Sequence, residues 1–104
     1  MIARVWKGRT TVANAEAYGA FLQRTAYPDY GGVEGNRGWL LLRREEAGTV
    51  EFTLVSFWES MDAVHRYAGA DAARPKYYPE DKACLLEPRS AAEHFDVLDA
   101  QWRP

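Results

Sequence analysis

Apolar and polar residues alternate along several short stretches of the chain, and a period of two residues is typical of β-strands. In the first such stretch, Ile2, Arg4 and Trp6 fall on one face of the expected strand. Ala47-Gly48-Thr49 separates two others, and a short connection that contains glycine predicts a hairpin. The pattern predicts strands over residues 2–9, 38–46, 50–58 and 94–100.

A period near 3.6 residues follows the first strand and predicts a helix whose inner face carries Tyr18, Phe21, Leu22 and Thr25. Thr11 and Asn14 are both good N-cap residues, so the pattern leaves two starts open. Pro28 predicts that the helix ends near Ala26, because a residue before proline avoids the α region. The glycine-containing residues 27–37 then predict a loop.

A second helix is predicted over residues 61–68, because Ser60 suits its N-cap and Gly69 stands where a C′ glycine belongs. The apolar stripe of this helix consists of Met61, Val64 and Ala68. His65 falls in the same stripe, so we expect its imidazole between the helix and the sheet. A further short helix is expected from residue 79 to about residue 86.

The order strand, helix, strand, strand, helix, short helix, strand is the βαββαβ arrangement of a ferredoxin-like fold, in the α+β class with an antiparallel sheet. The central strands are apolar on both faces, whereas a sheet covered by helices on one face should alternate apolar and polar. A large exposed apolar face marks an interface. We therefore expect residues 1–104 to form one domain that pairs as a homodimer, a dimeric α/β barrel.

Composition narrows the classes of partner. Thirteen basic and 15 acidic residues give a net charge of −2 without a basic patch, so neither nucleic acid nor a membrane surface is an expected partner. The sequence has no apolar run of signal-peptide or membrane-spanning length, and we expect a cytoplasmic protein. Aromatic residues make up 13% of the chain, which points to a core, an interface or a pocket.

Motifs that would indicate a metal or another cofactor are missing. The glycine-rich residues 31–38 lead into a strand, whereas a phosphate-binding loop precedes a helix. Asp62, His65 and His94 are too small a supply of ligands to predict a metal site. Gly-x-Ser-x-Gly does not occur, and Cys84 has no neighbouring histidine. We expect no metal and no cofactor.

His65 and Tyr77 are the candidates for catalysis. Histidine titrates near neutral pH, which suits a pocket base, although an inward histidine can equally be a buried residue with one satisfied hydrogen bond. Tyr77 and its neighbour lie in a connection that crosses the end of the helix–sheet layer, and the sequence does not say which of them lines a pocket. Candidates for substrate binding are polar or aromatic residues of the sheet and this connection: Arg4, Trp6, Trp39, Phe57, Trp58, Tyr78 and His94. The sheet aromatics are equally typical of a core or an interface.

The sequence resembles the antibiotic biosynthesis monooxygenase family over nearly its whole length. The most specific stretch joins the third strand to the second helix and reads aromatic-Trp-Glu-Ser-x-x-Ala. The resemblance rests on Ile2-Ala3-Arg4-Val5-Trp6, Gly35-Asn36-Arg37-Gly38, Phe57-Trp58-Glu59-Ser60-Met61-Asp62-Ala63 and Tyr77-Tyr78-Pro79-Glu80-Asp81. It implies a small, dimeric, ferredoxin-like protein.

The resemblance also implies a function. Some members oxidise polyketide anthrones or quinols with molecular oxygen and no cofactor, and others degrade haem. Haem-degrading members use an Asn on the first strand, a Trp in the second helix and a His shortly after it. Here Trp6-Lys7, Arg66-Tyr67 and Lys76 stand instead, which argues against haem degradation. The anthrone oxygenases' set of Asn, Trp, Tyr and Arg is not matched either.

The resemblance therefore favours a cofactor-independent monooxygenase that binds a small aromatic, polyketide or quinol substrate between the sheet and the helices. Two other functions stay open: a non-catalytic dimer that binds a small hydrophobic ligand, and a polyketide cyclase or isomerase, because a fold does not determine a function.

Overall fold

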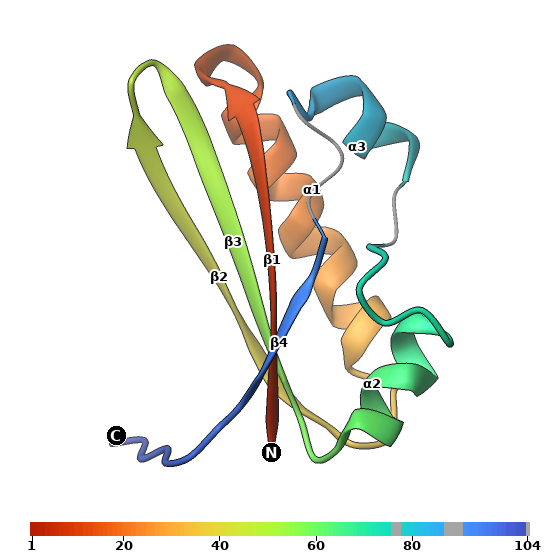
Figure 1. The fold of residues 1–104 in the computed structure, drawn as a ribbon. Helices are drawn as coiled ribbons and strands as arrows, with labels where there is room; N and C mark the ends of the chain where they lie inside the picture. The colour runs from red at the N-terminus through yellow and green to blue at the C-terminus, as the bar shows by residue number, and fades with distance from the viewer. Residues whose placement is uncertain (76–77, 87–90, 104) are drawn as a thin grey trace.

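The computed structural model describes residues 1–75, 78–86 and 91–103, apart from the side chain of residue 27. Figure 1 shows the elements in chain order. They are β1 (Ile2–Thr11), α1 (Val12–Tyr30), β2 (Asn36–Glu46), β3 (Thr49–Trp58), α2 (Met61–Ala68), α3 (Pro79–Cys84) and β4 (Glu93–Asp96). In these described ranges, no helix has the length and apolar character needed to cross a membrane.

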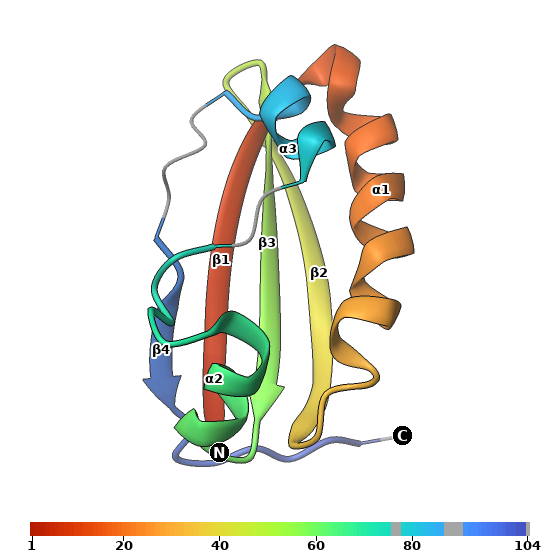
Figure 2. The same ribbon diagram turned by 90° about the vertical axis from the view of Figure 1, so that its right-hand side faces the viewer.

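The strands form one sheet in the order β2-β3-β1-β4, and every neighbouring pair is antiparallel. The register places Trp6 opposite Leu54, and Leu54 opposite Leu41, so these side chains form a row on one face. All the labelled helices cover this face (Figures 1 and 2). The predicted ferredoxin-like α+β fold is confirmed, whereas the homodimer stays a prediction.

Hydroxyl groups cap two of the helices. The Thr11 Oγ1 accepts a hydrogen bond from the Asn14 backbone N–H at 3.2 Å, so Thr11 is the N-cap residue of α1. The Ser60 Oγ accepts one from the Ala63 N–H at 3.2 Å and caps α2 as predicted. Both caps satisfy backbone donors that have no partner within the first helical turn.

The predicted end of α1 near Ala26 is wrong, because the helix continues through Pro28 to Tyr30. Proline removes one backbone hydrogen bond from the last turn. That turn, however, buries the ring of Tyr30, which is 3% exposed and contacts aromatic rings of the sheet and of α2. Burial of this large side chain outweighs the loss of one hydrogen bond.

Helix α2 turns a different face to the sheet from the one predicted. Its buried residues are Ala63, Val64 and Tyr67. His65 is exposed, and its Nδ1 lies 2.8 Å from a backbone carbonyl at the C-terminal end of the helix. The predicted inward orientation of His65 is therefore wrong. The helix buries the Tyr67 ring against Trp58, a larger apolar surface than an imidazole offers.

The last strand is shorter than the predicted 94–100 and spans Glu93–Asp96. It pairs only with β1, and Asp96 stands opposite Ile2, the first residue of that strand. Beyond this pair one further hydrogen bond, from the Val97 N–H to the Met1 carbonyl at 2.9 Å, joins the two segments.

The face of the sheet away from the helices is called here the open face. Leu40, Leu42 and Phe95 are 41%, 49% and 50% exposed on it. Phe57 lies on the same face and contacts the Trp102 ring, with a centroid distance of 5.9 Å. In Figure 1 the C-terminal segment leaves the sheet on this side. The structure thus agrees with the expectation of central strands that are apolar on both faces.

Candidate functional site

A cavity lies between the sheet and the helices, where two clusters of buried side chains meet. Its walls come from β1, β3, α1, α2 and the segment that leads into α3. Its free volume is about 50 Å³. A buried water needs roughly 10–15 Å³ of such space, so the cavity has room for a few water molecules.

A wider hollow of about 530 Å³ lies on the open face beside Phe57 and Trp102. Its charged lining residues, Arg37 and Glu59, pair with each other at 3.1 Å and are both largely exposed. The other residues that line this hollow are apolar, whereas the inner cavity also has charged and phenolic side chains, so the inner cavity is the candidate site.

Strand β1 supplies the floor of the cavity with Arg4 and Trp6, which lie two residues apart and so share a face. The indole of Trp6 lies over Gly8, where an added Cβ would approach the Trp6 Cη2 to 2.5 Å and the Leu85 Cδ2 to 2.8 Å. Glycine at position 8 therefore allows the Trp6 ring to lie along the strand, and Leu85 holds it there.

The Arg4 side chain is 3% exposed. One terminal nitrogen donates to the Ala72 carbonyl at 3.3 Å, and the guanidinium lies 5.4 Å from the centre of the Tyr67 ring. Among the described residues no carboxylate lies within ion-pair distance of Arg4, and its Nε–H has no acceptor. The Trp6 Nε1–H, on the same face, is also buried without an acceptor.

Tyr30 and Tyr67 form a second wall, with their ring centres 4.9 Å apart. Burial raises the pKa of both phenols above the usual value, so both keep their protons at neutral pH. Trp58 stacks on Tyr67 at 5.5 Å and donates its Nε1–H to the Ser56 Oγ at 2.9 Å. The aromatic wall is thus held from behind by a fully buried indole.

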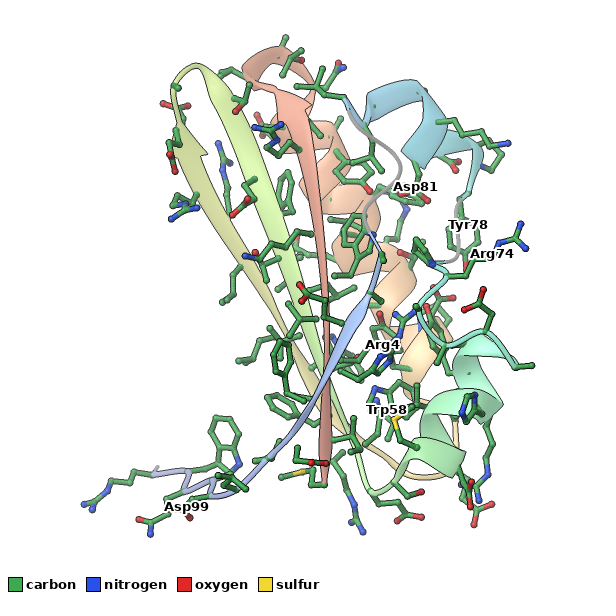
Figure 3. The ribbon with its side chains drawn as sticks, viewed as in Figure 1. Arg4, Trp58, Arg74, Tyr78, Asp81 and Asp99 are labelled. Atoms are coloured by element: carbon green, nitrogen blue, oxygen red, sulfur yellow. The ribbon has the colours of Figure 1, made fainter. Side chains whose placement is uncertain are left out.

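Two of the residues that line the cavity are carboxylates that bind phenols. The Tyr78 hydroxyl donates to Asp29, with distances of 2.8 and 3.0 Å to its two oxygens. This hydrogen bond, together with burial, raises the pKa of Tyr78 to about 12. Asp81 accepts hydrogen bonds from the Tyr18 hydroxyl and from the Tyr78 backbone N–H. Figure 3 shows Tyr78 and Asp81 beside the cavity and Arg4 between the sheet and the helices.

His94 lies at the edge of the site, on β4 and opposite Arg4 in the sheet register. Its Nε2 is buried and has no hydrogen-bond partner in the described part of the chain. Burial lowers the pKa of His94, and the positive charge of Arg4 lowers it further. The ring is therefore neutral at pH 7.

The predicted site residues are divided among several locations. Arg4, Trp6 and Tyr78 line the cavity. Trp39 and Trp58 belong to the cluster behind it, Phe57 lies on the open face and His65 points outward. Tyr77 lies outside the described residues. The functional roles proposed for these residues from the sequence stay predictions.

The sequence analysis did not select Asp29, Tyr30, Tyr67 or Asp81, which also line the cavity. One signal was available for Tyr67, because it follows Ala63 by four positions and Val64 by three, the spacing of one helix face. Asp81 is only 4% exposed, yet a carboxylate in the first turn of a short helix ordinarily indicates a favourable position near the helix dipole. In the described residues, no group of three His, Cys, Asp or Glu side chains could hold a metal ion.

No family model matches the chain, and no curated protein matches it. Solved structures do. The Mycobacterium tuberculosis protein Rv0793 has a TM-score of 0.66 and 20% identity, over 95% of this chain and 96% of that one. The heme-degrader MhuD of the same organism, with two hemes bound in its active site, has a TM-score of 0.68 and 17% identity, over 98% and 100%.

A candidate antibiotic biosynthesis monooxygenase from Bacillus cereus has a TM-score of 0.60 and 12% identity, over 98% of this chain and 97% of that one. These similarities extend over nearly the whole of each chain. Because the sequence identity is low, they establish the fold alone. The resemblance seen in the sequence is confirmed at that level. The chain has the fold of the antibiotic biosynthesis monooxygenases.

Proposed function

We propose that this protein is a cofactor-independent oxygenase that acts on a small, planar aromatic compound with an acidic C–H or O–H group. One observation carries the proposal: a carboxylate, Asp29, and a guanidinium, Arg4, face the same aromatic-lined cavity. A base and a positive charge in a site lined mainly by aromatic and apolar side chains are what proton removal and anion stabilisation require.

The chemistry balances without a cofactor. Oxygen is a triplet and reacts slowly with closed-shell compounds, but a carbanion can transfer one electron to it. The two radicals then combine to a peroxide anion, which takes back the proton from the base as a hydroperoxide, and the hydroperoxide loses water and leaves a carbonyl. One activated CH2 group and one O2 thus give one C=O group and one water, so no external reductant is consumed.

In this scheme Asp29 accepts the proton and Arg4 stabilises the anion that remains. Tyr78 keeps its proton at neutral pH, because its pKa is raised to about 12, and it holds the Asp29 carboxylate in place. The phenols of Tyr30 and Tyr67 also stay protonated and face the same space as hydrogen-bond donors or acceptors.

A planar aromatic substrate needs more room than the closed cavity offers, because ligand pockets usually measure about 300–1,000 Å³. Binding therefore requires the walls to part. The Tyr78–Asp29 hydrogen bond joins the segment before α3 to α1, and we expect it to lengthen or break as substrate enters.

Haem degradation, the activity of MhuD, is not the function we favour. Within the described residues, no histidine lines the cavity, and the residues that the family's haem degraders use are replaced here.

We also propose that a second copy of the chain covers the open face and that the homodimer is the functional form. The exposed apolar side chains on this face, Leu40, Leu42 and Phe95, support this pairing.

Oxygen uptake by the purified chain tests the proposed activity, with anthrone, a hydroxylated anthrone and a naphthoquinol as substrates. We expect uptake above autoxidation with at least one of them, and Asp29→Asn should slow it by roughly 10²-fold or more. Asp99→Asn, on the C-terminal segment away from the cavity, is the matched control and should keep the rate (Figure 3).

Equal rates for Asp29→Asn and the unchanged protein would contradict the role of Asp29. Tight binding of these compounds without oxygen uptake would favour a ligand-binding protein. Conversion of a compound in the absence of oxygen would favour a cyclase or isomerase.

A further inference from the structure

Two N–H groups on the cavity floor have no hydrogen-bond acceptor among the residues that the structure describes, the Nε–H of Arg4 and the Nε1–H of Trp6. Both side chains are more than nine-tenths buried, at 3% and 7% exposed, and both line the cavity. Few buried donors in native proteins are left without a partner, and each one needs an explanation. Two such donors on one face of one strand point to an acceptor that no described residue of the protein supplies.

The charge of Arg4 says what kind of acceptor this is. Guanidinium is always protonated in proteins, and a buried, uncompensated charge is destabilising. The Ala72 carbonyl and the Tyr67 ring contact the guanidinium but carry no negative charge. A neutral acceptor would satisfy the Nε–H and leave the charge uncompensated, whereas an anionic oxygen would do both.

The carboxylates of the cavity do not supply this anion. Asp29 accepts the hydroxyl of Tyr78 with both of its oxygens, at 2.8 and 3.0 Å. Asp81 accepts hydrogen bonds from the hydroxyl of Tyr18 and from the backbone of Tyr78. Neither lies within ion-pair distance of Arg4.

We propose that the cavity selects ligands that carry an anionic oxygen, a carboxylate or an ionised hydroxyl, and binds that oxygen with the Arg4 Nε–H and the Trp6 Nε1–H. This deepens the proposed function, on which it rests for the location of the substrate site. It assigns Trp6 a recognition role through its indole N–H, beyond the packing of its ring.

Both donors are preorganised. Arg4 is held from behind by the Ala72 carbonyl and by the Tyr67 ring, so its Nε–H is not free to turn away. The Trp6 ring lies over Gly8 and belongs to the same buried cluster as Leu85. A ligand therefore meets two fixed donors, and hydrogen bonds from a charged donor to an anionic acceptor are the strong class.

Binding to the purified full chain is measured by calorimetry with 2-naphthoate and with its neutral analogue 2-naphthamide. We expect naphthoate to bind at least about tenfold more tightly, because charge-assisted hydrogen bonds contribute more than neutral ones. A second arm uses 4-nitrophenol below and above its own pKa, which separates an ionised hydroxyl from a carboxylate as the preferred anion.

Arg4→Met should abolish the preference for naphthoate and leave the affinity for naphthamide within about twofold, because the replacement keeps the length of the side chain without its charge. Trp6→Phe should reduce naphthoate binding by about threefold to tenfold, the effect of one hydrogen bond. Arg43→Met, at an exposed position of β2, is the control and should change neither affinity.

The melting temperature without ligand separates ligand binding from a structural role. Arg4→Met should keep or raise it, because an apolar replacement relieves an uncompensated buried charge. A lower melting temperature with unchanged selectivity would make Arg4 a structural residue and overturn the proposal. Should Arg4→Met not fold, Arg4→Lys keeps the charge without the Nε donor, and an undiminished preference for naphthoate would equally overturn it.

The two proposals fail separately. Anion selectivity is measured without turnover, so an absence of oxygen uptake leaves it standing. Equal affinity of the unchanged protein for naphthoate and naphthamide, together with oxygen uptake above autoxidation, would overturn the anion site and leave an oxygenase.

Discussion

The two faces of the sheet are both apolar, yet they differ in what covers them. On the face under the helices, Trp58 is fully buried, and polar groups such as Arg4 and Asp81 are buried with it. On the open face, Leu42 and Phe95 remain about half exposed, and Phe57 contacts only a ring of the C-terminal segment among the rings that the structure describes. The covered face thus combines apolar packing with buried charge, whereas the open face carries exposed apolar side chains and, toward the β2–β3 hairpin, exposed charged ones such as Lys7 and Arg44.

This difference indicates on which face of the sheet to expect a ligand and on which to expect a second copy of the chain. A buried charge is costly and is found where a partner or a ligand compensates it, so the covered face is the place to look for a ligand. An exposed apolar face without buried charge has the character of a homodimer interface, whose core is more apolar than the rest of a protein surface. The same amino-acid types therefore serve different purposes on the two faces.

The largest expected effect is a difference in the free energy of unfolding between variants of two neighbouring aromatic residues on opposite faces of the sheet. Trp58→Ala should lower the free energy of unfolding by about 3–5 kcal/mol, because it empties a fully buried site stacked on Tyr67. Phe57→Ala should cost less than about 1 kcal/mol for the folding of a single copy, because this ring is only partly buried. Urea unfolding of both variants measures the contrast, and equal losses would contradict the distinction between the faces.

A smaller effect separates folding from assembly. Leu41→Lys puts a charge on the covered face, against a buried cluster, and should destabilise the fold by about 2 kcal/mol or more. Leu40→Lys puts the same charge on the open face and should leave the melting temperature of the single copy nearly unchanged while it prevents dimer formation. Sedimentation at micromolar concentration reports the latter. If the unchanged protein sediments as a single copy, the proposal that a second copy covers the open face is wrong.

The smallest effect concerns β4, where His94 turns to the helices and Phe95 to the open face. The pKa of His94 is lowered in the folded protein, by burial first and by Arg4 next. Between this lowered pKa and the unfolded value of about 6.5, the unfolded chain binds more protons at His94 than the folded chain does. The free energy of unfolding therefore decreases as the pH is lowered through this range.

His94→Gln should remove this part of the acid destabilisation. Melting temperatures at about pH 7.5 and about pH 5 should then differ by less than they do for the unchanged chain. An identical difference for both proteins would show that His94 does not contribute to the acid sensitivity.

Strand patterns predicted the molecule more closely than helix patterns did. Side chains of a strand alternate by half a turn, so one apolar position determines the face of every other. Arg4 and Trp6 were placed on a common face in this way, and both line the cavity. An eight-residue helix has a broad apolar stripe, and a shift by one position rotates it by about 100°. For α2, a shift by one position moved His65 off the face that packs on the sheet and placed Tyr67 on it.

The sequence by itself determined the order of the elements, the antiparallel α+β fold and the apolar character of both faces of the sheet, because these follow from local periodicity and turn chemistry. Only the tertiary structure decided which polar groups converge. Asp29 and Tyr78 are 49 positions apart, and Tyr18 and Asp81 are 63 apart, yet each pair forms a hydrogen bond. No local pattern encodes such contacts, because they depend on how the helices settle on the sheet.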